Sequence, residues 1–309
     1  MSRLQANCLL LLTAFLWGSG NVAQRTILED IGPFAAIGLR CLIAAIVILP
    51  VALRQGRPRL GGGRRRALLL MGLTAGSFAA ATTAMQISYG YTTVTNASFL
   101  VNTTTVMIPF AVWLLLKQRP GPAVWPAALI TLAGTWLMSG GSFMHLNSGD
   151  VLCLIAAVCY TIWFIYLGEF VQSFGFAGLV SIVQFALTAA VTLLLSAAFE
   201  TTTLSGLWAA TPELIYLGAV STGLVYFLQG MAQRHTPACE AAIIVSAEAL
   251  FGALSASYML GERLSPGGFL GAALITFGIV PVQLPLGAGW LVRRKTAALP
   301  APATETGTS

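Results

Sequence analysis

Ten long apolar runs constrain this chain more than any other feature of its sequence. A transmembrane helix needs about 20 mostly apolar residues to cross the hydrocarbon core of a bilayer. Runs of this kind cover residues 7–26, 33–53, 67–89, 94–116, 122–140, 150–168, 177–199, 212–232, 237–260 and 266–285. Short connections rich in glycine and proline separate them. The pattern predicts an all-α membrane protein with ten transmembrane helices.

The composition excludes several classes of function. Only 8% of the residues are charged and 57% are hydrophobic, whereas about a quarter of a soluble domain is charged. The net charge of +6 comes mainly from basic residues beside apolar runs, which indicates anchoring at a membrane rather than nucleic-acid binding. The chain has no P-loop, no CxxC pair and only two histidines, His145 and His235, expected in loops on opposite sides of the membrane. We therefore expect neither an enzyme nor a cofactor nor a metal site.

The distribution of lysine and arginine predicts the orientation. With the N-terminus inside, thirteen of the 16 basic residues fall on the cytoplasmic side, and Arg25 and Arg263 fall on the other side. The positive-inside rule then places both termini in the cytoplasm, which agrees with an even number of spans. We expect a multi-pass protein of the plasma membrane, the inner membrane of a bacterium. The alternative that the first run is a cleaved signal peptide is disfavoured, because the repeat described next needs that helix.

An internal repeat divides the chain. Residues 127–131 (AALIT) recur as residues 272–276, and Pro122 recurs as Pro266, at a period of about 144 residues. Each half holds five spans, and five is odd, so the second half must cross the membrane in the opposite direction. We predict a first repeat at 1–144, an inverted second repeat at 145–290, a central cavity between them, and a disordered cytoplasmic tail at 291–309.

Polar residues recur at helical spacing on six spans. In hydrocarbon such side chains need a partner or a water-filled cavity, so the stripes predict a shared polar interior. They comprise Thr13, Trp17, Asn21 and Gln24; Thr82, Gln86 and Tyr89; Thr95, Ser98, Asn102, Thr105 and Pro109; Ser181, Gln184, Thr188 and Thr192; Thr222, Tyr226, Gln229 and Gln233; and Glu248, Gly252 and Ser255. The fifth and tenth spans are almost wholly apolar, with small residues four apart, and are expected to pack away from the cavity.

Two charged residues within spans are candidates for function. Glu248 lies near the middle of the ninth span, where a carboxylate costs about 2.5–3.5 kcal/mol on insertion scales; it could carry a proton, receive a substrate amine, or serve only as a structural hydrogen-bond partner. Arg40 could attract a carboxylate or phosphate, or extend its guanidinium to the outer headgroups. Asp150 and Glu240 sit at span ends and are interpreted as interfacial. Gly18–Gly20 permits either a bend, as in a flexible gate, or the close approach of another helix.

These residues together resemble the drug/metabolite transporter superfamily, specifically its ten-helix EamA-type members. The resemblance covers nearly all of residues 7–285. It depends on Leu16-Trp17-Gly18-Ser19, Arg40, Gly149-Asp150, Ala247-Glu248, and Leu260-Gly261-Glu262-Arg263-Leu264 followed by Gly271-Ala272-Ala273-Leu274. Gln118 departs from the usual glutamate of the first half, and Ala249 stands where a proline commonly follows the glutamate.

The resemblance implies a transporter that moves small metabolites, often amino acids, by alternating access, with export as the default direction. Aromatic or bulky amino acids are favoured by Trp17, Trp163 and Tyr226; drugs, nucleosides or sugars, and a non-transporting receptor or assembly subunit, remain alternatives. The expected partners are a small-molecule substrate and the lipid bilayer, and the protein is expected to be a monomer or a weak homo-oligomer. The expected cavity residues are Trp17, Asn21, Arg40, Thr82, Gln86, Asn102, Trp163, Gln184, Tyr226, Gln229 and Glu248, with Glu248 as the candidate for proton coupling.

Overall fold

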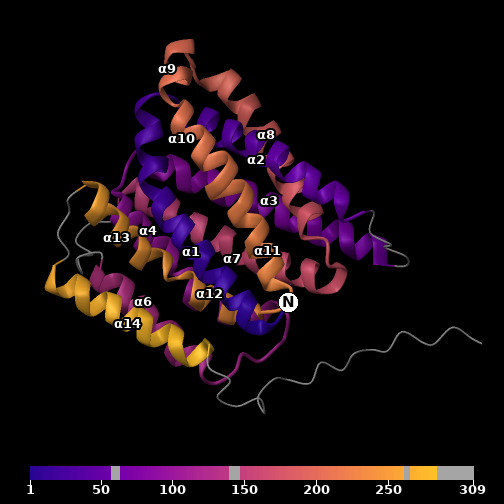
Figure 1. Cartoon of the computed structure of the whole chain (residues 1–309), viewed down its shortest axis with the longest axis vertical. Helices are drawn as coiled ribbons and strands as arrows, with labels where there is room; N and C mark the ends of the chain where they lie inside the picture. Colours follow the sequence, from indigo (N-terminus) through magenta and orange to yellow (C-terminus); the bar gives the residue numbers. More distant parts are fainter. Residues whose placement is uncertain (57–62, 139–146, 261–264, 284–309) are drawn as a thin grey trace, which may run out of the picture.

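The computed structural model of the chain describes residues 1–56, 63–138, 147–260 and 265–283. In this part of the chain every regular element is helical (Figure 1). The helices are α1 (Arg3–Thr26), α2 (Pro33–Arg54), α3 (Arg64–Ser88), α4 (Val94–Asn102), α5 (Thr104–Leu115), α6 (Val124–Met138), α7 (Ser148–Phe174), α8 (Ala177–Phe199), α9 (Leu204–Ala209), α10 (Thr211–Ile215), α11 (Val225–Gln233), α12 (Ala238–Val245), α13 (Glu248–Leu260) and α14 (Pro266–Gln283). A short 3₁₀ helix, η1 (Ile27–Glu29), follows α1, and a π-helix, η3 (Tyr216–Leu224), joins α10 to α11.

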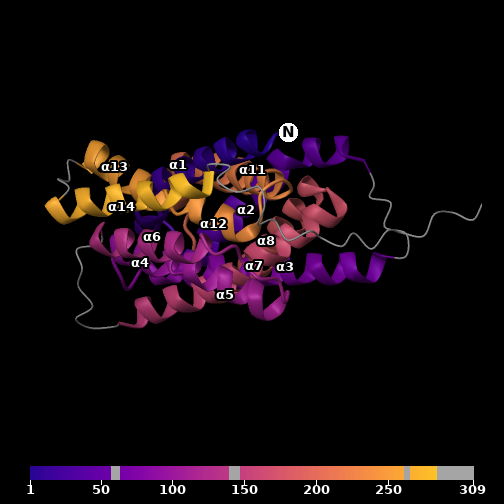
Figure 2. The same cartoon turned by 90° about the horizontal axis from the view of Figure 1, so that it is seen from below.

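The ten predicted spans are confirmed as helical segments. Eight segments are long and apolar enough to cross a membrane, and α6 and α14 supply two shorter apolar helices. Figure 2 shows the helices running roughly alongside one another in one bundle. The predicted tail at 291–309, Arg263 and His145 lie outside the described residues.

Contacts between helices follow the inverted repeat. The second and seventh spans, α2 and α8, pack together, as do the fifth and tenth, α6 and α14. The first span packs against the eighth and ninth, and the sixth packs in the corresponding way against the third and fourth. In Figure 1, α6 and α14 lie at the opposite edge of the bundle from α2 and α8. This reciprocal pairing is the one expected of two halves of opposite direction that are related by a pseudo-two-fold axis.

Local sequence signals explain where several helices begin. Ser2 and Asn147 start capping boxes at α1 and α7, in which the cap side chain accepts a hydrogen bond from the third helical residue. Pro33 opens α2 because its missing N–H needs no partner there. The carboxylate of Glu200, just after α8, accepts hydrogen bonds from the N–H groups of Phe34 and Ala35, each at 2.8 Å. One acidic side chain thus caps α2 and ties the two halves together.

The fourth and ninth spans are interrupted, although the hydropathy pattern predicts one continuous helix for each. The fourth divides into α4 and α5 at Thr103, and the ninth into α12 and α13 at Ser246 and Ala247. The second half-helices begin at Thr104 and Glu248, which are 144 residues apart, the period of the sequence repeat. The same break therefore occurs at the same place in both halves. The eighth span also departs from a regular α-helix, since its middle is the π-helix η3.

Glycines let helices approach closely at two places. The helix α1 continues without interruption through Gly18–Gly20, and a Cβ added at Gly18 would lie 2.5 Å from the carbonyl oxygen of Glu248. A Cβ added at Gly134 in α6 would lie 2.6 Å from the carbonyl oxygen of Gly271 in α14. By contrast, a Cβ added at Gly76 in α3 would meet nothing within 4 Å. Close backbone approach at small residues is a main source of packing between membrane helices.

We expect Gly134→Ala to destabilise the protein, because the added methyl group must push α6 and α14 apart, at a cost of about 1–3 kcal/mol. The matched control Gly76→Ala adds the same group where space is open, and should leave stability unchanged or raise it by about 0.5–1 kcal/mol. The apparent melting temperature of each variant in detergent measures the difference. Equal melting temperatures for the two variants would contradict the proposed contact.

Candidate functional site

One cavity lies between the two halves, in the part of the bundle where the broken helices meet. The centre of a water molecule can reach about 90 Å³ of it, which is room for several waters. Its lining comes from α1, α2, α3, both parts of the two broken helices, α7, η3 and α11. Seven of the expected cavity residues line it: Trp17, Asn21, Arg40, Asn102, Trp163, Tyr226 and Glu248.

Four expected residues are buried in the helix packing and do not line this cavity: Thr82, Gln86, Gln184 and Gln229. Thr82 donates a hydrogen bond to the carbonyl oxygen of Phe78 within its own helix, at 2.9 Å. Gln86 donates to the carbonyl oxygen of Gln24 at 2.8 Å. A polar face directed inward can therefore pack against another helix rather than line the cavity. Helical spacing alone does not distinguish these two cases.

Arg40 turns into the protein rather than to the headgroups. Its side chain is 5% exposed, and its Nη1 donates a hydrogen bond of 2.7 Å to Oε1 of Gln24. Its Nε is buried with no hydrogen-bond partner. The guanidinium is always charged, so a buried, incompletely paired donor facing a cavity is suited to an anionic group.

Glu248 supplies the opposite charge. It is the first residue of α13 and lines the same cavity, as does Asn21 of α1, whose Nδ2 donates a hydrogen bond of 3.5 Å to the hydroxyl group of Ser98. Among the described residues the ion pairs are Arg3–Glu240 and Arg66–Glu169, so Arg40 and Glu248 do not pair with each other. The cavity therefore holds a cation and a carboxylate, each with capacity for a ligand.

Aromatic rings form one wall. Tyr226 contacts Trp17 at a ring-centroid distance of 4.8 Å and Trp163 at 5.3 Å, both edge to face. Trp163 donates its indole N–H to Oε1 of Gln184 at 2.9 Å, so Gln184 orients this wall from behind. Rings fixed in this way present apolar faces and a few hydroxyl groups to a ligand.

Two residues at the helix breaks line the cavity, although they are not among the expected cavity residues. Thr104 and Ser246 line the cavity at the breaks of the fourth and ninth spans. Thr104 stands 144 residues before Glu248, and Ser246 stands 144 residues after Asn102. Applying the repeat period to the two expected residues would have found both. Gln24, Tyr89 and Thr222 also line the cavity. All three belong to the polar stripes, but none of them is among the expected cavity residues.

Other expected features lie away from the cavity. Asp150 is buried at the start of α7, where it accepts hydrogen bonds from Thr92 at 2.7 Å and Asn96 at 2.5 Å. Glu240 pairs with Arg3 at the N-terminal end of the bundle. The helices α6 and α14 contribute nothing to the lining. Within the described part of the chain, no three histidine, cysteine, aspartate or glutamate side chains gather as metal ligands would.

Comparison with known proteins agrees with this architecture. A protein of Archaeoglobus fulgidus, named an uncharacterized transporter, is 28% identical over 287 residues, which cover 92% of this chain and 87% of that protein. The uncharacterized transporter YwfM of Bacillus subtilis is 30% identical over 186 residues, which cover 55% of this chain and 58% of that protein. A solved crystal structure superposes with a TM-score of 0.76 at 18% identity, over 92% of this chain and 99% of that one, which shows the same fold.

The family model gives the assignment. The model of the EamA-like transporter family matches the chain twice, at residues 4–140 and 147–282. Together the two matches cover nearly the whole ten-helix bundle. This chain is therefore a multi-pass membrane transporter that belongs to the EamA-like transporter family, within the drug/metabolite transporter superfamily.

Proposed function

We propose that this transporter exports amino acids, with a preference for bulky or aromatic side chains, by secondary active or facilitated transport. The observation that carries the proposal is the pair of opposite charges, Arg40 and Glu248, which face one aromatic-walled cavity without pairing with each other. A free amino acid carries the complementary pair, a carboxylate and an ammonium group, beside a side chain of variable size.

The chemistry of each group supports this substrate class. Arg40 can donate to a carboxylate in a charge-assisted hydrogen bond, which is about twice as strong as a neutral one. Glu248 can accept from an ammonium group. Burying either charge alone is costly in a low-dielectric site, and a zwitterion neutralises both in one step. A nucleoside or a sugar offers neither charge.

The aromatic wall supports the preference for bulky side chains. Trp17, Trp163 and Tyr226 bury large apolar surfaces and stack with other rings. Entry of such a substrate requires the two halves to separate around the cavity, which lies between them. That widening is the movement expected of alternating access between inverted repeats.

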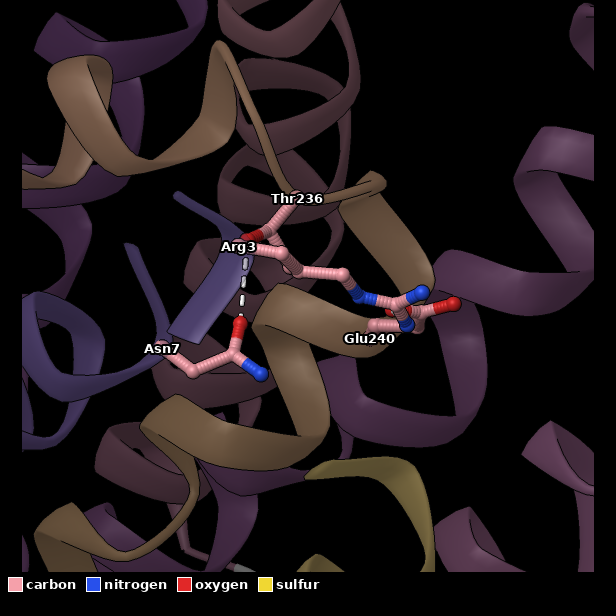
Figure 3. A network of polar contacts seen from close by, with 4 residues as sticks. All are labelled: Arg3, Asn7, Thr236 and Glu240. Atoms are coloured by element: carbon pink, nitrogen blue, oxygen red, sulfur yellow. Dashed lines mark hydrogen bonds and ion pairs between the residues drawn. The ribbon is translucent and has the colours of Figure 1, made fainter. Parts of the chain in front are cut away.

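We infer that such a movement begins at a set of polar contacts at the N-terminal end of α1 (Figure 3). Arg3 of α1 forms an ion pair with Glu240 of α12, and Thr236 donates a hydrogen bond to Oδ1 of Asn7 at 3.0 Å. Asn7 and Thr236 are fully buried. These contacts join the first proposed repeat, 1–144, to the second, 145–290. Opening the cavity toward this end, which we assign to the cytoplasm, requires them to separate.

We expect purified protein in liposomes to move radiolabelled L-phenylalanine with saturable kinetics. Arg40→Met and Glu248→Gln should each lower the flux about 10–100-fold, because each removes a charged partner worth about 1.5–3 kcal/mol. Gln172→Met is the control, since Gln172 donates to the carbonyl oxygen of Gln233 away from the cavity and should retain flux. Transport of nucleosides, sugars or cationic drugs without amino acids would contradict the substrate class. Binding of L-phenylalanine without flux would contradict the proposal that the protein transports amino acids.

Proton coupling through Glu248 is a separate prediction. A carboxyl group in the cavity can exchange a proton for a substrate ammonium group, so an inward proton gradient should drive L-phenylalanine outward. The measurement is flux from loaded liposomes with and without an imposed pH gradient, for the wild type and Glu248→Gln. We expect the gradient to accelerate only the wild type. Flux that ignores the gradient in both proteins would show facilitated transport without protons.

The proposed orientation predicts the location of the chain ends in the bacterial inner membrane. Alkaline phosphatase, which is active only outside the cytoplasm, should be inactive when fused after Ser309 and active when fused after Thr202, between α8 and α9. A fluorescent-protein fusion after Ser309 should report the cytoplasm. The opposite pattern of activities would reverse the orientation and, with it, the assignment of the Arg3 end to the cytoplasm.

A further inference from the structure

A second group of polar side chains is buried outside the cavity, where α7, α8 and α11 meet. Ser181 and Gln184 lie on α8, and Gln229 and Gln233 lie on α11; we refer to these four residues as the amide cluster. Each of them is at most 1% exposed. Nε2 of Gln233 donates a hydrogen bond of 3.3 Å to the main-chain carbonyl oxygen of Phe164 in α7. The cluster therefore lies behind the aromatic wall of the cavity, which Gln184 also contacts through its bond to the indole N–H.

Most of the hydrogen-bonding capacity of the amide cluster is unused. Oγ of Ser181, Nε2 of Gln184, both amide atoms of Gln229 and Oε1 of Gln233 are buried with no partner among the described residues. A buried polar atom without a partner costs free energy, so an apolar side chain would pack better at each of these positions. The cluster is therefore suited to a state in which water or a ligand reaches it.

The internal repeat relates the amide cluster to the lining of the cavity. Three of its members stand one repeat period, 144 residues, after residues that line the cavity: Gln184 after Arg40, Gln229 after Met85, and Gln233 after Tyr89. The helices correspond in the same way, because α7, α8 and α11 belong to the sixth, seventh and eighth spans, and α1, α2 and α3 are the first, second and third. Three lining positions of the first half thus correspond to three buried amides of the second half.

The amide cluster lies toward the Arg3 end of the bundle, the end at which Arg3 pairs with Glu240. Gln233 is the last residue of α11, three residues before Thr236, whose hydroxyl group takes part in the contacts of Figure 3. The helix α8 begins at this end too, since a Cβ added at Gly230 of α11 would lie 3.3 Å from Cβ of Ala177, the first residue of α8. The cluster therefore lies between the Arg3 end and the cavity.

Arg40 approaches the cavity from the opposite end of the bundle. The helices α2 and α8 are antiparallel, because Glu200 follows the end of α8 and caps the start of α2. Arg40 and Gln184 each lie seven residues after the first residue of their helix, Pro33 in α2 and Ala177 in α8. Inverted repeats that exchange conformations open the opposite end with the corresponding residues. Gln184 therefore has the position at the Arg3 end that Arg40 has at the other.

We propose that the amide cluster lines the substrate pathway when the cavity opens toward the Arg3 end, where its unpartnered atoms bond water and the polar groups of the substrate. The inference rests on the proposed function, because it requires alternating access, and it adds a second set of contacts for the same substrate. The two sets differ in charge, since a guanidinium in the first half corresponds to a neutral amide in the second. A substrate carboxylate is held by a charge at Arg40 and by an uncharged donor at Gln184.

The test introduces one thiol at a time into the full chain and measures its reaction with a membrane-impermeant methanethiosulfonate. The reagent is added to membrane vesicles at the face on which the fusions described above place the Arg3 end. Ser181→Cys changes the side-chain volume little, and Gln229→Cys probes α11. The matched control is Gln86→Cys of α3, since Gln86 is also 1% exposed and its Oε1 also lacks a partner. Intact-protein mass spectrometry counts the labels beyond those on the wild type, which has five cysteines of its own.

We expect Ser181→Cys and Gln229→Cys to react about tenfold faster than Gln86→Cys, because the state that opens the Arg3 end exposes the cluster and leaves Gln86 buried. Absence of reaction at both cluster positions, or reaction from the opposite face alone, would overturn the proposal. Equal rates in all three variants would also overturn it, since they would show general loosening of the bundle. The reaction needs no substrate, so it tests the pathway separately from L-phenylalanine flux, which tests the proposed substrate class.

Discussion

Hydrocarbon offers no hydrogen-bond partners, and the arrangement of this protein depends on that constraint. Each polar side chain on a span must bond to its own helix, to another helix, or to groups in a cavity. Many threonines and serines take the first solution, as Thr188 does with the carbonyl oxygen of Gln184. The larger amide side chains of asparagine and glutamine bond to another helix or to groups in a cavity. The cavity is one place where the helices alone leave a polar group unsatisfied, as they do the Nε of Arg40.

The inverted repeat determines where that cavity lies. Both halves break the corresponding helix at the same repeat position, so Thr104 and Glu248 each begin a half-helix and both line the cavity. Gly18 permits α1 to approach the start of α13 closely, because a side chain at this position would meet the carbonyl oxygen of Glu248. The two halves are no longer identical in chemistry, since a hydroxyl group in one half corresponds to a carboxyl group in the other. This difference gives a symmetric scaffold an asymmetric site.

Separation of the two charges is the feature that distinguishes this site from a structural ion pair. If Arg40 and Glu248 bonded directly, each would neutralise the other and neither would need a ligand. Gln24 satisfies part of the hydrogen-bonding capacity of Arg40 without neutralising its charge. The site is thereby left stable enough to fold and polar enough to bind. Seen in this way, the polar stripe on α1 organises the cavity as much as the charged residues do.

The sequence alone determined the number of spans, the family, the repeat, and the inward direction of the polar faces, because hydropathy, charge placement and periodicity are local properties. It did not determine the breaks in the fourth and ninth spans, which no proline or glycine at those positions marks. Nor did it separate the residues that line the cavity, such as Asn102, from those that brace it, such as Gln184. Only the tertiary structure separated the lining residues from the bracing residues. Helical spacing defines a face of one helix, but the packing of the neighbouring helices decides whether that face meets a cavity or another side chain.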